Sequence, residues 1–273
     1  MERIGEINKN KYGTEMKIIE FRNREDIVVE FMDKYKYRKR TTYRNFLNSA
    51  VKNVYDKTVF NVGYYGDGKY VAKIDGEHTT AYKKWRSMIV RCYDEKYSNA
   101  HPTYKDCIVC EEWHNYQNFA KWFEDNYYEI PGEIMDLDKD ILIEGNKIYS
   151  PETCVFVPQS LNKIFNHKKN KKSGLPIGVK RDGKRFYATC GNGRNNEIYC
   201  GRFDTAEEAF YLGYLPMKRK IADEKINNYK EYLPTKLYDK LINYEIKMHE
   251  VNKINQEDFK NDVVQYGLCK PHS

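Results

Sequence analysis

The sequence predicts a mixed α+β protein with more than one module, on three observations. β-prone runs dominate the chain as far as about Ile74, whereas from about Thr79 apolar residues recur every three or four positions, as on one face of a helix. After the stretch 173–176 (Ser-Gly-Leu-Pro), which is typical of a linker, strand-like alternation returns. A chain of 273 residues is also long for a single core. We therefore expect three modules, over residues 1–75, 76–172 and 173–273.

The first range is expected to form a small β-rich module. Residues 16–21 and 27–31 are β-prone runs, and the polar stretch between them, 23–26, fits a hairpin turn. Glycines over residues 63–68 mark a second turn, and residues 70–74 follow as a short strand. A lone glycine-rich turn of this kind is too weak a signal for a phosphate-binding loop.

Two helices are expected in the second range. The first carries an apolar face of residues three or four positions apart: Tyr82, Trp85, Met88, Ile89 and Cys92. The second, over residues 115–126, ends before Pro131-Gly132 and carries an aromatic face: Tyr116, Phe119, Trp122 and Phe123. We interpret both faces as core.

The third range is expected to begin with three strands. Residues 177–189 alternate like a strand pair around Asp182-Gly183, which is a tight hairpin signal, and residues 198–203 give the third strand. Thr205 and Glu208 then form a capping box that opens a helix.

That helix is expected to run over residues 206–228, but it contains Gly213 and Pro216. A proline inside a helix lacks the N–H donor and clashes with the preceding turn, so we expect Pro216 to kink the element or divide it into two shorter helices. Residues 236–251 are expected to form a terminal helix.

The charge of the chain is moderately positive and unevenly distributed. Lys and Arg number 47 against 40 Asp and Glu, a formal charge of +7, and basic residues cluster over 34–44, 167–172 and 180–185. Such clusters attract polyanions, although the alternative for each is an ordinary solvated surface. The 25 tyrosines suit surfaces that touch bases or phosphates, or reflect an AT-rich genome.

The cysteines and the hydropathy indicate the compartment. Seven cysteines, an odd number at irregular spacing, and no signal peptide favour a reducing cytoplasm. No apolar run approaches the roughly 20 residues that span a bilayer, so no membrane partner is expected.

The candidate functional site is an acidic stretch followed by a turn and an amide-bearing stretch. Leu-Asp-Lys-Asp over residues 137–140 precedes Tyr-Ser-Pro-Glu-Thr-Cys over 149–154, and Asn162 and Asn166 follow, one helical turn apart. Phosphodiester hydrolysis requires an activated water and neutralisation of the phosphoryl charge, which a divalent ion held by carboxylate and amide oxygens supplies. These hard ligands favour Mg²⁺ or Mn²⁺.

These residues resemble the motif of HNH endonucleases, which occur among phage-encoded and intron-encoded homing endonucleases. The stretches 82–93 and 110–113 resemble the lead-in common in that family. The resemblance implies a ββα-metal unit within residues 76–172 and a metal-dependent DNA endonuclease of phage or mobile-element origin, acting in the cytoplasm of a bacterial host. It implies catalytic roles for Asp138, Lys139, Asp140 and Asn162, and metal ligation by Asp138, Asn162 and Asn166.

The motif departs from the family at two positions. Lys139 falls where the family keeps its general-base histidine, and Thr153 falls where it keeps its middle asparagine. A lysine is protonated at neutral pH, and lowering its pKa to 7 would require a drop of about three units, or roughly 4 kcal/mol. Lys139 is therefore better suited to a phosphate contact, and the base would be Asp140, His167 or His114. The alternative function is a catalytically inactive DNA-binding protein, such as a repressor or accessory factor.

The pair Cys107 and Cys110 raises the question of a zinc site. Cys154 and His114 would complete four ligands, but the second Cys-x-x-Cys pair that makes such a signal strong is missing. We expect buried thiols rather than zinc at these positions.

A second resemblance covers the third range. Residues 177–179, 186–188 and 201–209 together resemble the plant APETALA2-type DNA-binding domain, in which a three-stranded sheet enters the major groove and a helix packs behind it. The resemblance implies contact with double-stranded DNA by side chains of the sheet: Arg181, Lys184, Arg185, Tyr187 and Arg202. Arginine on a strand can read guanine edges, while the alternative is a solvent-facing charged sheet.

Further DNA contacts are expected from two basic clusters, through Lys168, Lys169, Lys171, Lys172, Arg38 and Arg40. A third function class also stays open. The tyrosine-rich N-terminal module would suit a phage protein that binds and blocks a host defence enzyme.

Overall fold

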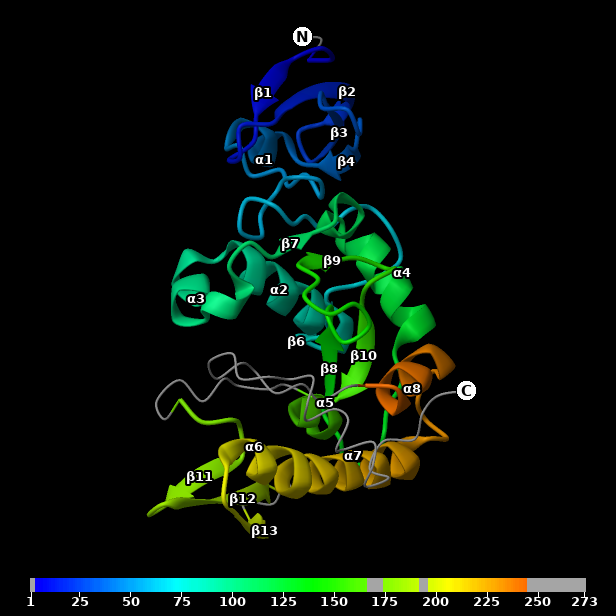
Figure 1. Ribbon diagram of the computed structural model, residues 1–273. Helices are drawn as coiled ribbons and strands as arrows, with labels where there is room; N and C mark the ends of the chain where they lie inside the picture. Colours follow the sequence, from blue (N-terminus) through cyan, green and yellow to red (C-terminus); the bar gives the residue numbers. More distant parts are fainter. Residues whose placement is uncertain (1–2, 166–173, 192–195, 245–273) are drawn as a thin grey trace. The chain divides into compact units, whose positions relative to one another are not determined.

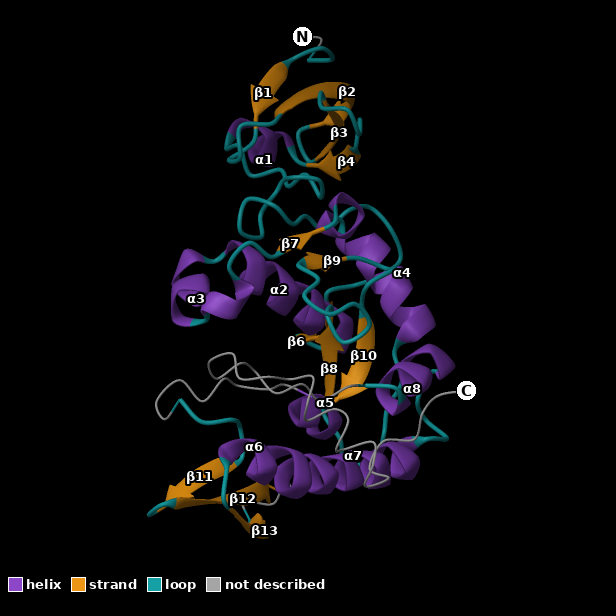
Figure 2. Cartoon of the chain, in the orientation of Figure 1, coloured by secondary structure: helices purple, strands orange, loops and turns teal. Residues whose placement is uncertain are grey.

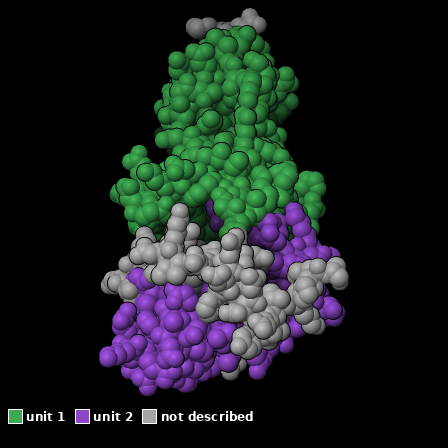
Figure 3. All heavy atoms as spheres, in the orientation of Figure 1, with its two compact units in different colours: residues 1–127, 143–154 green, residues 128–142, 155–273 purple. Residues whose placement is uncertain are grey.

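The computed structural model describes residues 3–165, 174–191 and 196–244, and it confirms a mixed α+β fold (Figures 1 and 2). The chain forms two compact units, which Figure 3 distinguishes by colour. Unit 1 holds residues 1–127 and 143–154, and unit 2 holds residues 128–142 and 155–273. The units therefore cut across the three ranges expected from the sequence. The chain passes from one unit to the other three times.

Unit 1 begins with a four-stranded antiparallel sheet in the order β1–β2–β3–β4, followed by a short helix, α1. The elements are β1 (Ile7–Lys9), β2 (Glu15–Asn23), β3 (Asp26–Phe31), β4 (Arg38–Thr41) and α1 (Tyr43–Leu47). The predicted hairpin is confirmed, with Asn23 paired to Asp26 across its turn. Along β3, Ile27, Val29 and Phe31 are fully buried, as the period of a half-buried strand requires.

The helical part of unit 1 is built on α2 (Thr80–Tyr93) and α4 (Tyr116–Asn126), which pack against each other and confirm both predicted helices. Thr79 caps α2 by accepting from the Tyr82 N–H, and Asn115 caps α4 in the same way. Shorter elements complete this part: β5 (Lys73–Ile74), β6 (Glu77–His78), α3 (Glu95–Ala100), η1 (Pro102–Tyr104), β7 (Ile108–Val109), η2 (Glu111–His114) and β9 (Ile148–Tyr149). The strand expected over residues 70–74 is thus shortened to β5.

Unit 2 begins with an antiparallel pair and a helix, β8 (Met135–Asp138), β10 (Val155–Pro158) and α5 (Gln159–Phe165). Two later helices, α7 (Leu215–Tyr229) and α8 (Thr235–Ile242), share a core with α5. The buried residues of this core come from all three helices, from β10 and from the loops after β8 and α7: Ile141, Val157, Leu161, Ile164, Phe165, Ala222, Ile226, Leu233, Leu237 and Leu241. The predicted terminal helix is confirmed as far as Ile242, and its remainder lies largely outside the described residues.

The second part of unit 2 is a three-stranded antiparallel sheet, β11 (Val179–Asp182), β12 (Arg185–Gly191) and β13 (Glu197–Phe203), as predicted. The predicted capping box is present: Thr205 accepts from the Glu208 N–H, and Glu208 accepts from the Thr205 N–H, opening α6 (Ala206–Glu208).

Of the two outcomes expected for Pro216, a kink or a division of the helix after the sheet, the division does not occur. α6 continues through a π-helical turn, η3 (Ala209–Tyr214), into α7, and Tyr214 and Leu215 keep helical backbone angles. A π-helical turn widens the helix just before the proline, which relieves the clash of its ring with the preceding carbonyl. Gly213 has its own reason: a Cβ there would lie 2.7 Å from the Ala188 Cβ, so only glycine lets this turn approach the sheet.

Among the described residues, no helix combines the length and the apolar character needed to span a membrane.

Candidate metal centre and nucleic-acid interface

The β8–β10 pair carries acidic residues on the face that α5 covers. Directly paired residues of antiparallel strands project from the same face. Asp138 pairs with Val155, and Asp136 pairs with Val157. Val157 is fully buried in the core that includes α5, and Val155 packs against the same core. Asp136 and Asp138 therefore project on the side of α5, the helix that carries Asn162.

The Asp138 carboxyl is buried and held by the turn that follows β8. It is 9% exposed, and its Oδ1 accepts hydrogen bonds from the backbone N–H groups of Asp140 at 2.9 Å and Ile141 at 2.8 Å. Burial, helped by the negative charge of Asp140, raises the pKa of Asp138 to about 6, although the two N–H groups act in the opposite direction. A bound cation would favour the charged carboxylate instead.

The Lys139 ammonium is shielded from solvent and paired with Asp140. Its Nζ lies 3.1 Å from Oδ2 of Asp140, with the lysine side chain 7% exposed and the aspartate side chain 47% exposed. This arrangement differs from the expectation that Lys139 contacts a phosphate, because a buried and paired ammonium is not presented at the surface. Lys139 instead positions Asp140 beside Asp138.

Asn162 lies within α5, half-buried between the fully buried Leu161 and the exposed Lys163. The other expected metal ligand, Asn166, lies outside the described residues, as do the base candidate His167 and the cluster Lys168, Lys169, Lys171 and Lys172.

Two of the candidate residues, Thr153 and His114, have local structural roles in unit 1. The Thr153 hydroxyl donates to the Ile148 carbonyl at 2.7 Å and lies 3.1 Å from the Ser150 hydroxyl, so it closes the turn before β10. His114, a candidate base, has its Nε2 3.1 Å from the Val109 carbonyl oxygen, and burial lowers the pKa of its imidazole.

The cysteine positions considered for zinc are buried or half-buried thiols. Cys107 is 3% exposed and Cys154 is 5% exposed, while burial raises the pKa of Cys110 above its ordinary value. Within residues 3–165, 174–191 and 196–244, no group of three or more His, Cys, Asp or Glu side chains could hold a metal ion.

The residues at the end of β8 nevertheless fit a hard divalent cation. Asp138 and Asp140 are neighbouring carboxyl groups, one of them buried with a raised pKa, and an ion between them would neutralise both. Since only two carboxylates take part, the remaining ligands would be an amide oxygen such as that of Asn162, and water.

The three-stranded sheet has a face that we name the polar sheet face. Its residues are fixed by the strand register: Lys180, Asp182, Arg185, Tyr187, Tyr199 and Arg202. Lys180 pairs with Tyr187, which in turn pairs with Arg202 across β13. The opposite face buries Val179, Ala188 and Cys190 in a core with η3.

The cations of the polar sheet face have acidic partners. Exposed ion pairs join Lys180 to Glu197 at 2.5 Å, Arg185 to Asp204 at 2.8 Å and Arg202 to Asp182 at 2.8 Å. Ion pairs this exposed contribute about 0–1 kcal/mol each, so a phosphate can replace the carboxylate at little cost.

The expectation that Arg181 shares the polar sheet face has to be corrected. Arg181 pairs with Phe186, which packs into the core beneath the sheet, and its guanidinium lies 5.0 Å from the centroid of the Phe186 ring. Because Lys180 pairs with Tyr187 and Arg181 with Phe186, Lys180 rather than Arg181 lies on the polar sheet face. Lys184 lies exposed in the turn between β11 and β12.

The sequence interpretation did not single out Lys180 or Tyr199. Tyr199 is 63% exposed, and its ring centroid lies 6.3 Å from that of Tyr187 on the same face. The alternation of β13 could have indicated Tyr199, but a register shift between Tyr187 and Thr189 breaks that alternation.

The two arginines expected to extend the DNA contact lie exposed on β4, an edge strand of the N-terminal sheet. Arg38 is paired with Glu30 at 2.8 Å, and Arg40 with Asp26 at 3.3 Å. These cations are therefore also partly neutralised by the neighbouring strand.

Comparison of the chain with known protein families, with curated proteins and with solved structures finds no match.

Proposed function

We propose that the protein is a metal-dependent DNA endonuclease of the ββα-metal type, with its cleavage site at the end of β8. The observation that carries the proposal is the placement of Asp138. This carboxyl is buried at the carboxyl end of β8, on the side of α5, and has a raised pKa beside a second carboxyl group. A buried acid beside another acid is a costly arrangement, and such arrangements concentrate at functional sites.

In this proposal Asp138, Asp140 and Asn162 hold a Mg²⁺ or Mn²⁺ ion, which when bound neutralises charge on the phosphoryl and leaving oxygens. The two N–H groups that Asp138 accepts fix the orientation of its carboxylate. Lys139, whose side chain is shielded from solvent, neutralises Asp140 and so orients the second carboxylate.

We propose the polar sheet face as the DNA-reading surface. Lys180, Arg185 and Arg202 exchange their carboxylate partners for phosphates or base edges, while Tyr187 and Tyr199 offer flat, partly apolar contact area. Double-stranded DNA is the expected partner.

The decisive experiment is a plasmid-nicking assay with Mg²⁺ and with Mn²⁺. We expect the wild type to relax supercoiled plasmid and chelator to stop it. Asp138→Asn is the sharpest variant, because asparagine keeps the Oδ1 acceptor for the two N–H groups and removes only the charge. Asn162→Ala is expected to act in the same direction, and Lys163→Ala on the exposed side of α5 serves as its control. Wild-type nicking that survives in Asp138→Asn would refute this assignment of the site.

A second candidate function, DNA binding without cleavage, is favoured by one observation. The residue at the position of the family's general base, Lys139, is buried and paired, so it cannot accept a proton from water while its ammonium is held by Asp140. Salt-dependent DNA binding by the wild type, with no nicking in either metal, would establish this function instead.

A further inference from the structure

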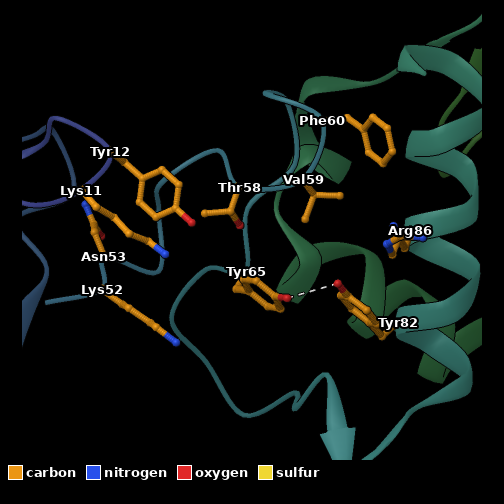
Figure 4. Close-up of a pocket in the computed structure, with 10 residues that line it drawn as sticks. All are labelled: Lys11, Tyr12, Lys52, Asn53, Thr58, Val59, Phe60, Tyr65, Tyr82 and Arg86. Carbon is orange, nitrogen blue, oxygen red and sulfur yellow. Dashed lines mark hydrogen bonds between the residues drawn. The ribbon is translucent and has the colours of Figure 1, made fainter. Parts of the chain in front are cut away.

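A pocket in unit 1 has no role in the proposed cleavage site. Figure 4 shows its lining residues, which come from the N-terminal segment, the loop before α2 and α2 itself. The volume of the pocket is about 370 Å³. Pockets that bind small molecules measure about 300–1,000 Å³, so the space suits one compact ligand.

The walls of the pocket carry three cations and no carboxylate. Lys11, Lys52 and Arg86 line it, and its other lining residues are aromatic, aliphatic or neutral polar. Across the described part of the chain, none of the three is in an ion pair, in contrast to Lys180 and Arg202 on the polar sheet face. Like charges gathered without a counter-ion repel one another, and a bound anion relieves that repulsion.

Aromatic rings supply the rest of the lining. Tyr82 is 4% exposed, its hydroxyl lies 3.1 Å from that of Tyr65, and the two rings are nearly parallel at 7°. Burial raises the pKa of Tyr82, so this wall stays neutral. Tyr12 is 50% exposed and projects from the N-terminal side, whereas Phe60 and Arg86 project from the other side (Figure 4).

Phe60 is held by a strained turn. Phe60 and the next residue, Asn61, both have positive φ, at 51° and 56°, and the turn closes with the Val62 N–H donating to the Val59 carbonyl at 3.1 Å. For residues other than glycine this conformation costs about 1–2 kcal/mol each. Such strain concentrates at ligand-binding sites, and here it sets the Phe60 ring 5.8 Å from the Arg86 guanidinium.

The opposite side of the pocket is fixed by a buried polar network. Asp56 is 7% exposed and accepts hydrogen bonds at 2.6 Å from both Asn10 and Thr14, which ties the loop after α1 to the turn between β1 and β2. Asn53 donates to Asp33 at 2.7 Å. Lys52 and Tyr12 are therefore carried by ordered backbone, which lowers the entropy cost of binding a ligand between them.

We propose that this pocket binds a nucleoside phosphate. The base would stack on the exposed ring of Tyr12 and the half-buried ring of Phe60, and the phosphate would lie among Lys11, Lys52 and Arg86. A purely cationic site would accept any anion and a purely aromatic site any apolar ring, whereas the combination selects a planar ring joined to negative charge. The ligand is either a free mononucleotide or one nucleotide of a strand. The proposal does not depend on cleavage at Asp138, which belongs to unit 2.

Titration calorimetry on the full chain tests the proposal with three probes: deoxyadenosine monophosphate, inorganic phosphate and a short single-stranded oligodeoxyadenylate. We expect the mononucleotide to bind at least about tenfold more tightly than phosphate, a difference of about 1.4 kcal/mol. Arg86→Gln and Tyr12→Leu are each expected to weaken mononucleotide binding about tenfold. Lys83→Gln removes the same charge from an exposed position of α2 outside the pocket, and we expect it to change the affinity less than about twofold.

Each outcome decides the question. Tighter binding of the oligonucleotide than of the mononucleotide identifies a strand as the source, and equal binding identifies a free nucleotide; both support the pocket. Equal affinity for phosphate and mononucleotide, an unchanged affinity in Tyr12→Leu, or an equal loss in Lys83→Gln and Arg86→Gln overturns the proposal. Because Tyr12 and Arg86 are exposed, matched thermal unfolding of the variants is expected.

Discussion

Nζ of Lys139 lies 3.1 Å from Oδ2 of Asp140, with the lysine side chain almost completely shielded from solvent. Lys139, which the resemblance to HNH endonucleases puts at the position of a general base, is therefore held in an ion pair. The proposed cleavage therefore requires a proton acceptor other than Lys139, whose charge is used to orient the Asp140 carboxylate.

The first prediction concerns that ion pair. Lys139→Met keeps most of the side-chain volume and removes the ammonium, so we expect double-stranded DNA affinity to be unchanged within about twofold. Lys139→Ala leaves a cavity as well and is expected to destabilise the chain by about 2–4 kcal/mol. Fluorescence anisotropy and denaturant unfolding measure the two effects. A large loss of affinity in Lys139→Met would show that the ammonium does reach the DNA.

The second prediction concerns pH and Asp138. The folded-state pKa of about 6 lies above the ordinary value of 3.8, so the native state binds the proton more tightly than the unfolded state. The contribution of Asp138 to the free energy of unfolding is fully present below pH 3.8 and is lost as the pH rises through 6. Asp138→Asn should therefore stabilise the chain at neutral pH by no more than about 3 kcal/mol, and by nothing near pH 4.

The difference in stability is measured from the denaturant midpoints of the wild type and of Asp138→Asn between pH 4 and neutral pH, without added metal. Adding Mg²⁺ at neutral pH is expected to raise the midpoint of the wild type but not that of Asp138→Asn. If Asp138→Asn raised the stability equally near pH 4 and at neutral pH, burial of the Asp138 charge would not be the cause of the increase.

A third prediction concerns the polar sheet face. Asp182 is paired with Arg202, so Asp182→Asn frees a guanidinium and removes a negative charge that would face a phosphate. We expect Asp182→Asn to strengthen double-stranded DNA binding, and Arg202→Gln to weaken it and to lower the slope of log affinity against log salt by about 0.9. Arg181→Gln, whose guanidinium lies over Phe186, is the matched control and should change this slope less. Weaker binding by Asp182→Asn would place the DNA elsewhere.

A fourth prediction concerns the contact between α5 and α7. Glu133 accepts hydrogen bonds from the Tyr229 hydroxyl at 2.6 Å and the Ser160 hydroxyl at 2.7 Å. Burial acts to raise the pKa of Glu133, but these hydrogen bonds lower it below its ordinary value of 4.5. The contribution of Glu133 to stability is therefore present above pH 4.5 and is lost as the pH falls below that value. Tyr229→Phe is expected to cost about 1–2 kcal/mol at neutral pH, and less in acid. Thermal unfolding at two pH values checks this, and a pH-independent loss would exclude a charged acceptor.

The sequence alone was sufficient to predict those structural elements that depend on residues close together in the chain. The hairpin of β2 and β3, the helices α2 and α4, and the capping box at Thr205 all follow from neighbouring residues, and all are present. Of the two helix faces expected to be core, Cys92, Trp122 and Phe123 are only half-buried. Asp138 was singled out as a candidate from the residues around it in the chain, but its burial and its raised pKa depend on the folded structure, which no short window of sequence encodes.

The remaining differences have physical causes. Whether Lys180 or Arg181 faces outward depends on a one-residue choice of register, and the turn at Gly183 allows both until the core beneath Phe186 selects one. Pro216 is tolerated because a π-helical turn precedes it, an adjustment that single-residue preferences do not anticipate. Lys11 and Arg86 are far apart in sequence, and only the fold brings both of them to the lining of the proposed nucleotide pocket.

The parallel pairing of β7 with β9 has a consequence for biosynthesis. Ile108 and Val109 align with Ile148 and Tyr149, and the residues between the two strands include the first segment of unit 2. The ribosome releases the chain from its amino end, so β7 is synthesised before its partner β9. Asp138 and the turn that follows it are synthesised between the two strands. The parallel pair can therefore form only after the first segment of unit 2 has been synthesised, which makes it a late event in the folding of unit 1 on the ribosome.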